Sequence, residues 1–357
     1  MDFSLADDEA LLCTTLRRWS ERQLRGWSAE ADRAGAAPAA LWGAAAELGL
    51  LVDAVPDDAG GLADGETSHL QRALRGIELG RGCAALAALC ETNVEPALAV
   101  ARWGSAAAKH ALFGALTAES APPRLAVTVH DWNDRLTIAE DGRGGLVVSG
   151  AIGPAPALAL ASHALVVAKG ALFLLPVAGV AAVTPSGWRA AAWGTLRLER
   201  AAVPAELVLS REASAGREVM AWWRCSLAAR AVGVATAAIE HAAAYGEERV
   251  QFGQPIGRFE SLARMRDENQ TAIAAARLLV LEAAWRIDRG AEGAADAASR
   301  ARDLAAQVVA RATIDAVQMY GGYGFVNDFP VEKLMRDARA FEVLGGNEAL
   351  VRLLERM

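Results

Sequence analysis

The chain contains little cysteine and little histidine, and neither is arranged as a metal or redox site. Its 357 residues include four cysteines, Cys13, Cys83, Cys90 and Cys225, in surroundings rich in alanine and leucine. This setting predicts buried thiols in a reducing cytoplasm. The five histidines are scattered, and no pair has zinc-site spacing. We therefore expect no metal site.

Long apolar runs and basic tracts are also lacking. Every stretch of about 20 residues is interrupted by charged or polar residues, which argues against a membrane span. The N-terminus, 1–4, has neither the basic nor the apolar region of a signal peptide. The net charge is −7, from 36 basic and 43 acidic residues without a basic tract. Nucleic acid is therefore not an expected partner, and a cytoplasmic location is expected.

Alanine is abundant, and it raises the hydrophobic share to 53%. Because alanine is the best helix former, the composition favours helices. Apolar residues recur every three or four positions through residues 1–120, which predicts an N-terminal α-helical domain. Short apolar and β-branched runs separated by turns predict a shortened β domain of antiparallel character over 121–211. The pattern returns to helix over 212–357, so we expect an α+β protein with a C-terminal helical bundle.

The pattern also predicts individual elements. Gly49 is expected to end a helix that begins near residue 41. Further helices are expected near 66–81, 84–100, 105–117, 221–249, 259–289, 295–320 and 331–341, with a last one running to the C-terminus. Strands are expected at 125–129, 136–138, 145–148, 164–168, 172–175, 196–198 and 203–209.

Three stretches carry a resemblance to a known family. The first joins 41–51 to the Val-Pro and Gly-Gly pairs of 55–61 and to the Glu-Leu-Gly-Arg of 78–81. The second, 245–259, contains Arg-Val-Gln-Phe-Gly between two long helices. The third joins Gln-Met-Tyr-Gly-Gly-Tyr-Gly-Phe at 318–325 to Val-Glu-Lys-Leu-Met-Arg-Asp-Ala-Arg at 331–339. Together they resemble the acyl-CoA dehydrogenase family along nearly the whole chain, with its N-terminal helical domain, middle β-barrel or sandwich domain and C-terminal four-helix bundle.

The resemblance implies FAD as the cofactor and a dimer at least. In the family, the positions of the second and third stretches hold the pyrophosphate and adenosine of an FAD whose flavin ring lies in the neighbouring subunit. The matching residues here are Arg249, Gln251, Phe252, Gln318, Gly321 and Gly322. The residue types suit that role, since arginine offers a planar fork of donors and glycine lets the backbone approach a ligand. The alternatives are a surface ion pair for Arg249 and a helix stop for the two glycines.

The family's catalytic base is missing from both of its usual positions. The reaction implied is α,β-desaturation of an acyl thioester, in which a carboxylate removes the α-proton and the flavin accepts the β-hydride. One base position falls on Gly345 and the other on Trp223, before Arg224. Neither side chain can accept the proton. Nearby carboxylates, Glu218, Glu342 and Glu348, are candidate substitutes that are equally explained as solvated helix-end charges.

The flavin-ring positions of the β domain also depart from the family pattern. Thr128 matches a residue of the ring-binding strand, but the small turn that should follow is replaced by residues 129–134. The second ring-binding motif falls on 150–158, which has neither tryptophan nor threonine. This half-site is therefore expected to be eroded. His130 and Asp131 are a candidate replacement pair, or a polar strand end.

These losses lead to one main hypothesis and two alternatives. The main one is an FAD-dependent acyl-thioester dehydrogenase in which this chain is the subunit without the catalytic glutamate, clamping the FAD of a homologous partner. Some actinobacterial acyl-CoA dehydrogenases of steroid side-chain catabolism are α2β2 tetramers of this kind, so lipid or steroid catabolism is the expected setting. The alternatives are a biosynthetic enzyme of the same fold, with an altered base or without flavin, and a non-catalytic structural subunit. The substrate, acyl-CoA or another thioester, is not identified by the sequence, nor is self-pairing excluded.

Overall fold

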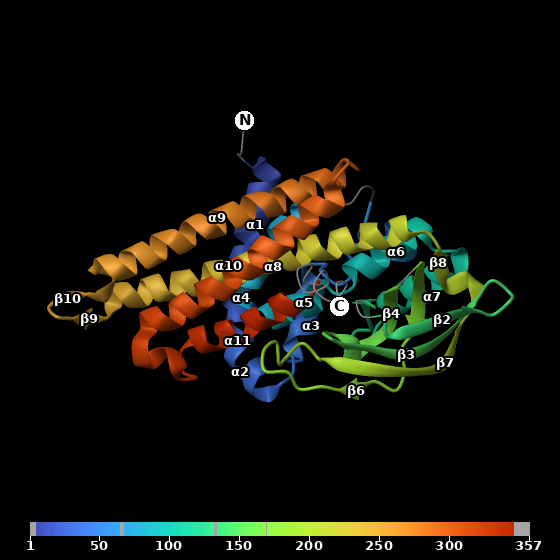
Figure 1. Cartoon of the computed structure of the whole chain (residues 1–357), viewed down its shortest axis with the longest axis horizontal. Helices are drawn as coiled ribbons and strands as arrows, with labels where there is room; N and C mark the ends of the chain where they lie inside the picture. Colours follow the sequence, from blue (N-terminus) through green and yellow to red (C-terminus); the bar gives the residue numbers. More distant parts are fainter. Residues whose placement is uncertain (1–4, 65–67, 121, 132–133, 169, 346–357) are drawn as a thin grey trace, which may run out of the picture.

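The computed structural model describes residues 5–64, 68–120, 122–131, 134–168 and 170–345. One helical part precedes a pair of β-sheets in the chain and another follows it, and the sheets lie at one end of the elongated molecule (Figure 1). The α+β architecture predicted from the sequence is confirmed. The helix predicted to reach the C-terminus and the candidate Glu348 lie outside the described residues.

The N-terminal part consists of short helices. They are α1 (Asp7–Trp19), a π-helical turn (Ser20–Leu24), α2 (Arg25–Ala34), α3 (Ala40–Glu47), α4 (His69–Gly82), α5 (Ala84–Glu91), α6 (Val94–Trp103) and α7 (Ala106–Leu116). Gly49 follows the end of α3 with φ of +70°, as predicted for a helix stop.

The helix predicted over 84–100 is in fact two helices. The break lies at Thr92 and Asn93, whose side chains form hydrogen bonds with backbone groups of other segments. The Asn93 amide donates to the carbonyl of Leu51 (2.9 Å) and accepts from the backbone N–H of Ala126 (2.8 Å). Thr92 donates to the carbonyl of Ala126 (3.0 Å). The break therefore ties strand β1 to the α5–α6 junction, which positions the cavities described below.

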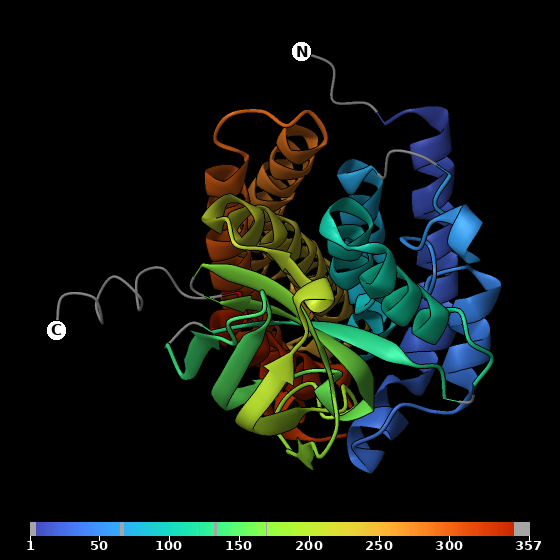
Figure 2. The ribbon, with the colours of Figure 1, turned by 90° about the vertical axis from the view of Figure 1, so that its right-hand side faces the viewer.

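The β part consists of two four-stranded sheets (Figure 2). One has the order β1 (Leu125–His130), β4 (Ala161–Ala168), β5 (Ala171–Pro176), β8 (Val208–Ser210). The other has the order β2 (Leu136–Glu140), β3 (Leu146–Ala155), β7 (Gly194–Val203), β6 (Ala181–Ala182). All neighbours are antiparallel except β1 and β4, which pair in parallel. The predicted antiparallel character therefore holds for every pair but this one, which is parallel because β2 and β3, which follow β1 in the chain, belong to the other sheet.

The C-terminal part is built on α8 (Ala213–Glu248), a helix of 36 residues. It packs with α9 (Glu260–Asp288), α10 (Ala294–Tyr320) and α11 (Pro330–Val343). A short hairpin joins α8 to α9, and its two strands, β9 (Val250–Gln251) and β10 (Gln254–Pro255), have two residues each. Figure 1 shows α8 running from the sheets to this hairpin at the far end of the molecule. The structure thus has two ends connected by one continuous helix.

One buried apolar cluster runs through all three parts, and the four cysteines are buried and free. The stretch Ala84–Trp103 is long and apolar enough for a membrane span by composition alone, although 83% of its apolar window is buried in the protein. This burial is what a core segment of a folded protein would show, so the stretch is weak evidence for a membrane span.

Candidate functional site

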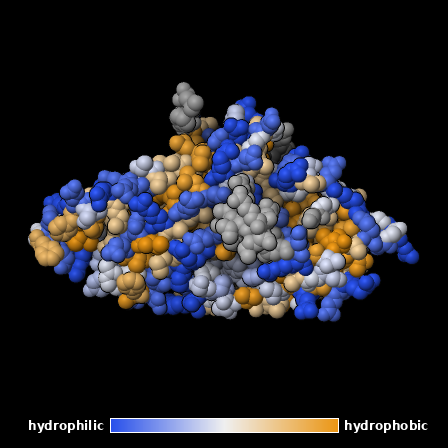
Figure 3. Space-filling model, in the orientation of Figure 1, coloured by the Kyte–Doolittle hydropathy of each residue, from blue (hydrophilic) through white to orange (hydrophobic). Residues whose placement is uncertain are grey.

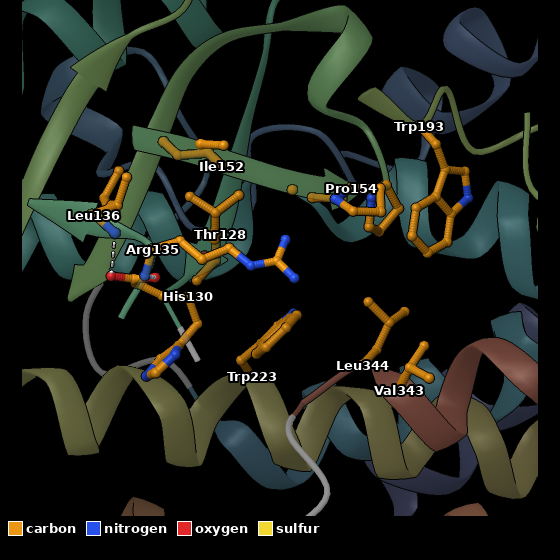
Figure 4. A pocket seen from close by; sticks show the side chains of 17 residues that line it. Thr128, His130, Arg135, Leu136, Ile152, Pro154, Trp193, Trp223, Val343 and Leu344 are labelled. Atoms are coloured by element: carbon orange, nitrogen blue, oxygen red, sulfur yellow. Dashed lines mark hydrogen bonds between the residues drawn. The ribbon is translucent and has the colours of Figure 1, made fainter. Parts of the chain in front are cut away.

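A cavity of about 290 Å³ lies where the sheets meet α8 and the end of α11 (Figure 4). Strands β1 and β3 contribute Thr128 and Ile152, α8 contributes Trp223, and the end of α11 contributes Leu344. Trp193 and the segment 153–156 complete the wall on the side of the sheets. We call this space the outer cavity. Its volume is at the lower end of the range of small-molecule sites.

Two polar side chains in the outer cavity are available to a ligand. Thr128 is 5% exposed, and its hydroxyl has no hydrogen-bond partner in the described part of the chain. A buried hydroxyl without a partner is costly, so it marks a place for a ligand or an ordered water. The side chain of Arg135 extends across the cavity (Figure 4). The strand residue predicted from the family pattern, Thr128, therefore lies in a cavity and not in a filled core.

His130 and Asp131 also line the outer cavity, but they do not form a catalytic pair with each other. The carboxylate of Asp131 accepts the backbone N–H groups of Arg135 (2.7 Å) and Leu136 (3.0 Å), which holds the turn into β2. Burial, reinforced by the positive charge of Arg224, lowers the pKa of His130 to about 4. A neutral histidine beside a turn-forming aspartate agrees better with a structural role.

Of the two predicted base positions, one lies in the wall of the outer cavity and the other next to it. Trp223, on α8, is half-buried and lies in the cavity wall, whereas Trp222 points to the other side of α8 and stacks on Trp103 (5.7 Å) and His69 (5.6 Å). Gly345 directly follows Leu344, which lines the cavity at the end of α11. Neither Trp223 nor Gly345 supplies a carboxylate.

The surroundings of Gly345 disfavour a side chain. Its φ is +83°, and a Cβ there would lie 3.0 Å from Leu227 Cδ1 and 3.2 Å from Arg302 Nε, so these side chains would have to shift slightly. Two arginines hold the backbone in place, because Arg224 donates to the carbonyl of Gly345 (3.0 Å) and Arg302 donates to that of Leu344 (2.6 and 3.0 Å). Glycine is therefore favoured at this position, mainly by the positive φ.

The other candidate carboxylates lie away from the outer cavity. Glu218 pairs with Arg102 (2.6 Å), and both line a different cavity of about 840 Å³ between α6, α8 and the end of α9. Glu342 pairs with Arg339 (2.7 Å), with 39% of its side chain exposed. Neither is placed to remove a proton from a group held beside Trp223.

A second, smaller space lies behind the outer cavity. Its volume is about 30 Å³, and it shares Thr128, Pro156, Trp223 and Leu344 with the outer cavity. We call it the inner cavity. Its remaining wall includes Trp188 and three charged side chains, Glu91, Glu95 and Arg230, all of them buried. An interior wall that contains two carboxyl groups and a guanidinium is not expected of a space for an aliphatic chain.

The predicted pyrophosphate-clamp residues lie at the opposite end of α8. The predicted set comprises Arg249, Gln251, Phe252, Gln318, Gly321 and Gly322, all of which are exposed. Arg249 forms no ion pair within the described ranges, and its guanidinium lies 5.5 Å from the ring centre of Tyr323. The helix-stop reading of the glycines holds for Gly321, which ends α10 with φ of +58°.

This end of the molecule also exposes apolar side chains. Phe252 is 93% exposed and Phe325 74%, together with Val250, Tyr323 and Val326. Figure 3 shows hydrophobic surface at this tip among charged residues. Exposed aromatic residues beside an unpaired arginine are typical of a protein or ligand interface.

The two sets of predicted residues are too far apart to contact one small molecule. Trp223 and Arg249 are separated by 26 positions of α8 and its cap. At 1.5 Å per residue, this corresponds to about 39 Å. A molecule held in the outer cavity of this chain therefore cannot reach Arg249 of the same chain.

Several residues of the site were missed by the sequence reading. Arg135 and Trp193 lie beyond the family motifs, and nothing in their local sequence marks them. Glu91 and Glu95 carried a signal, since two glutamates one turn apart interrupt an otherwise apolar helical stretch. Arg230 gave a similar signal in the apolar centre of α8.

Comparisons with known proteins agree with this architecture. Family models described as the N-terminal and C-terminal domains of acyl-CoA dehydrogenase match residues 6–120 and 214–354. An acyl-CoA dehydrogenase of Bacillus subtilis (strain 168) is 38% identical over 162 residues, which are 44% of this chain and 42% of that protein. The chain thus matches less than half the length of this relative.

Solved structures match over the whole chain. Butyryl-CoA dehydrogenase from Megasphaera elsdenii has a TM-score of 0.85 at 24% identity, covering 99% of this chain and 98% of that one. A prolyl acyl carrier protein oxidase has a TM-score of 0.83 at 19% identity, covering 98% of each chain. At these identities the two structures establish the fold alone.

Proposed function

Because the chain belongs to the acyl-CoA dehydrogenase family, we propose that it is a subunit of an FAD-dependent acyl-thioester dehydrogenase whose cofactor sites are shared between subunits. A bound FAD would supply the acceptor for the hydride that leaves the β-carbon of the acyl group. In this proposal the chain clamps the FAD of a homologous partner and lacks the base for its own acyl site.

The residues of the two half-sites fit such a cofactor. In the outer cavity, the buried Thr128 hydroxyl without a partner can hydrogen-bond a ring acceptor, Trp193 offers an aromatic wall, and Arg135 brings a positive charge. At the far end of α8, Arg249 offers two parallel donors for a pyrophosphate, and Gln318 offers an amide. Since about 39 Å separate the ends, the clamp would serve a cofactor whose ring lies in another subunit.

Gly345 is the observation that carries the proposal. Its positive φ disfavours a side chain, a Cβ would lie close to Leu227 and Arg302, and glycine itself offers no carboxylate at the position that the family resemblance assigns to the base. With Trp223 in the other position, neither usual base position of this chain can take the α-proton. The partner, an acyl-CoA dehydrogenase with an intact base, would do so, and α2β2 is the assembly we favour.

An absorption spectrum of the purified chain tests this. We expect the chain alone to be colourless, and to carry FAD after co-expression with a homologous subunit that retains the glutamate. One flavin per chain in a homo-oligomer that desaturates acyl thioesters would contradict the partner proposal. Colourless protein after every co-expression would contradict the FAD proposal itself.

A second candidate function is favoured by the inner cavity. Glu95 is 5% exposed there, and burial raises its pKa, against the opposing effects of Arg230 and of a hydrogen bond from Ser226. A buried carboxyl of raised pKa is a typical general base. In this case the chain would be a biosynthetic dehydrogenase with an altered base, acting on a carrier-bound thioester.

The nearly isosteric Glu95→Gln separates the two functions. As the base, Glu95 would contribute at least about a hundredfold to turnover, with FAD content and thermal stability retained. Turnover of the variant above a tenth of wild type would exclude Glu95 as the base.

The alternative that the chain is a non-catalytic structural subunit has its own test. It is contradicted if the assembled complex loses FAD when Arg249 is replaced.

A further inference from the structure

The inner cavity has hydrogen-bond donors without acceptors. Arg230 Nε, Trp188 Nε1 and Thr128 Oγ1 are all in its wall, and none has a hydrogen-bond partner in the described ranges. The three side chains are between 0% and 5% exposed. Buried donors that lack acceptors each cost about 1–3 kcal/mol, so their convergence on one space needs an occupant that accepts hydrogen bonds.

Most acceptors of the same wall already have donors. Glu91 accepts from Arg75 Nε (3.0 Å) on one oxygen and from Arg230 Nη1 (2.9 Å) on the other. Glu95 accepts from the hydroxyl of Ser226 (2.8 Å) on Oε1. The three donors without acceptors therefore favour an occupant that accepts hydrogen bonds, an anion or a carbonyl.

The charges around the inner cavity point the same way. Three buried guanidinium groups, those of Arg72, Arg75 and Arg230, face the carboxylates of Asp53 and Glu91. Burial would raise the pKa of Asp53, but Arg75 and Arg72 lower it below its ordinary value, so it is ionised. Of the three guanidinium groups, that of Arg230 is in the wall of the inner cavity, where it presents a positive charge that it shares with Glu91.

Size restricts what the inner cavity can hold. Its volume of about 30 Å³ exceeds the roughly 10–15 Å³ that one water needs. A carboxylate fits, whereas a long aliphatic chain or a sterol side chain does not. The wall shared with the outer cavity at Thr128, Trp223 and Leu344 places such a carboxylate at the inner end of a ligand that enters from the outer cavity.

We propose that the inner cavity is a subsite for a terminal carboxylate, so that the chain binds short acyl thioesters of dicarboxylic acids. Arg230 Nε and Trp188 Nε1 would donate hydrogen bonds to the carboxylate, and the Thr128 hydroxyl would remain available to the flavin ring. The inference deepens the proposed function, on which it rests in assuming that the acyl group arrives as a thioester.

Calorimetry with two non-reactive probes tests the subsite. The probes are the malonyl and isovaleryl amides of the pantetheine analogue in which an amine replaces the thiol. They have the same number of heavy atoms and a similar shape, but the first ends in a carboxylate and the second in two methyl groups. We expect the full chain, in its flavin-containing assembly if it needs one, to bind the malonyl amide at least tenfold more tightly. Equal affinities, tighter isovaleryl binding, or no binding of the malonyl amide would overturn the proposal, and the inner cavity would then hold water.

Two variants check the assignment without removing buried charge. Trp188→Phe deletes one N–H, and Arg230→Lys keeps the positive charge but lacks the Nε donor. Each is expected to weaken the malonyl probe about tenfold and to leave the isovaleryl probe unaffected. Trp222→Phe, on the other side of α8, is the matched control and should change neither affinity. If Trp188→Phe and Arg230→Lys both bound the malonyl probe like wild type, the subsite would be wrongly placed.

The visible flavin spectrum is recorded on the same samples. Intact FAD binding without malonyl preference would overturn the subsite and leave the proposed function standing. Loss of malonyl preference together with loss of FAD in Trp188→Phe would show that the variant acts on the cofactor, which would also overturn the subsite.

Discussion

The two ends of α8 differ in how their arginines are used. At the sheet end, Arg224 and Arg302 are buried or half-buried and donate to the backbone carbonyls of Leu344 and Gly345. At the hairpin end, Arg249 is exposed without an ion pair in the described ranges, and Phe252 is 93% exposed. The arginines of the first end hold the chain's own backbone, whereas the second end presents a donor and apolar surface outward. In the proposed assembly, this second end would meet another subunit.

The largest expected effect is at the hairpin end. Arg249→Ala should weaken FAD binding by the assembled complex about a hundredfold, because a bidentate, charge-assisted contact with the pyrophosphate is lost. Flavin retained after gel filtration measures this. Arg289→Ala is the control, since Arg289 is also exposed and lies against Trp285 (4.8 Å) at the end of α9. Equal flavin retention in both variants would contradict the proposed contact of Arg249 with the cofactor, and the hairpin end would then have no role in FAD binding.

The next effect concerns the sheet end. Gly345→Ala should lower the free energy of unfolding by about 2–3 kcal/mol, from the cost of positive φ and from overpacking against Leu227 and Arg302. Gly290→Ala isolates the first contribution, because its φ is +56° and a Cβ there meets no atom within 4 Å. We expect the control to lose only about 1 kcal/mol. Equal losses in urea unfolding would mean that the space around Gly345 is not filled.

A smaller effect, opposite in sign for stability and for binding, is expected at Thr128. Thr128→Val removes a buried hydroxyl that has no partner within the described residues, so the chain without ligand should gain up to about 1 kcal/mol. FAD binding should weaken about fivefold, because the hydrogen bond from this hydroxyl to the flavin ring is lost. Thr128→Ser, which keeps the hydroxyl, should retain affinity. A valine variant that loses stability and binds FAD normally would show that the hydroxyl serves the fold alone.

The smallest effect lies beside α8, between the two ends. Burial, together with Arg72, lowers the pKa of His69 to about 3 from its ordinary 6.5. As pH falls below 6.5, the unfolded chain takes up a proton that the folded chain refuses, so stability is lost toward acid. Between pH 7 and pH 6 we expect a loss of about 0.7 kcal/mol from this group. His69→Phe keeps the stack on Trp222 and should reduce the loss, and identical pH profiles in urea unfolding would contradict the assignment.

The order of helical and strand regions and the helix stop at Gly49 followed from the sequence, whereas the assignment of Gly345 and Trp223 to the two base positions stays a prediction. The first two depend on local periodicity and on turn chemistry, which a single chain displays directly. The break between α5 and α6 did not follow, because Asn93 is decided by partners at Leu51 and Ala126. The parallel pairing of β1 with β4 was also missed, because it joins strands that are separated in the chain by β2 and β3.

Only the tertiary structure decided what each half-site contains. It brought Asp53, Arg75, Glu91 and Arg230, from four separate segments, into one buried cluster beside a small cavity. It also gave Gly345 its positive φ and filled surroundings, and it separated Trp223 from Arg249 by the length of a straight helix. Charge pairing and packing depend on distances between segments that are remote in the chain. The apolar periodicity of the sequence does not predict those distances. The family motifs thus identify the two half-sites, whereas the polarity and size of the inner cavity come from the packing of β1, α5, α6 and α8.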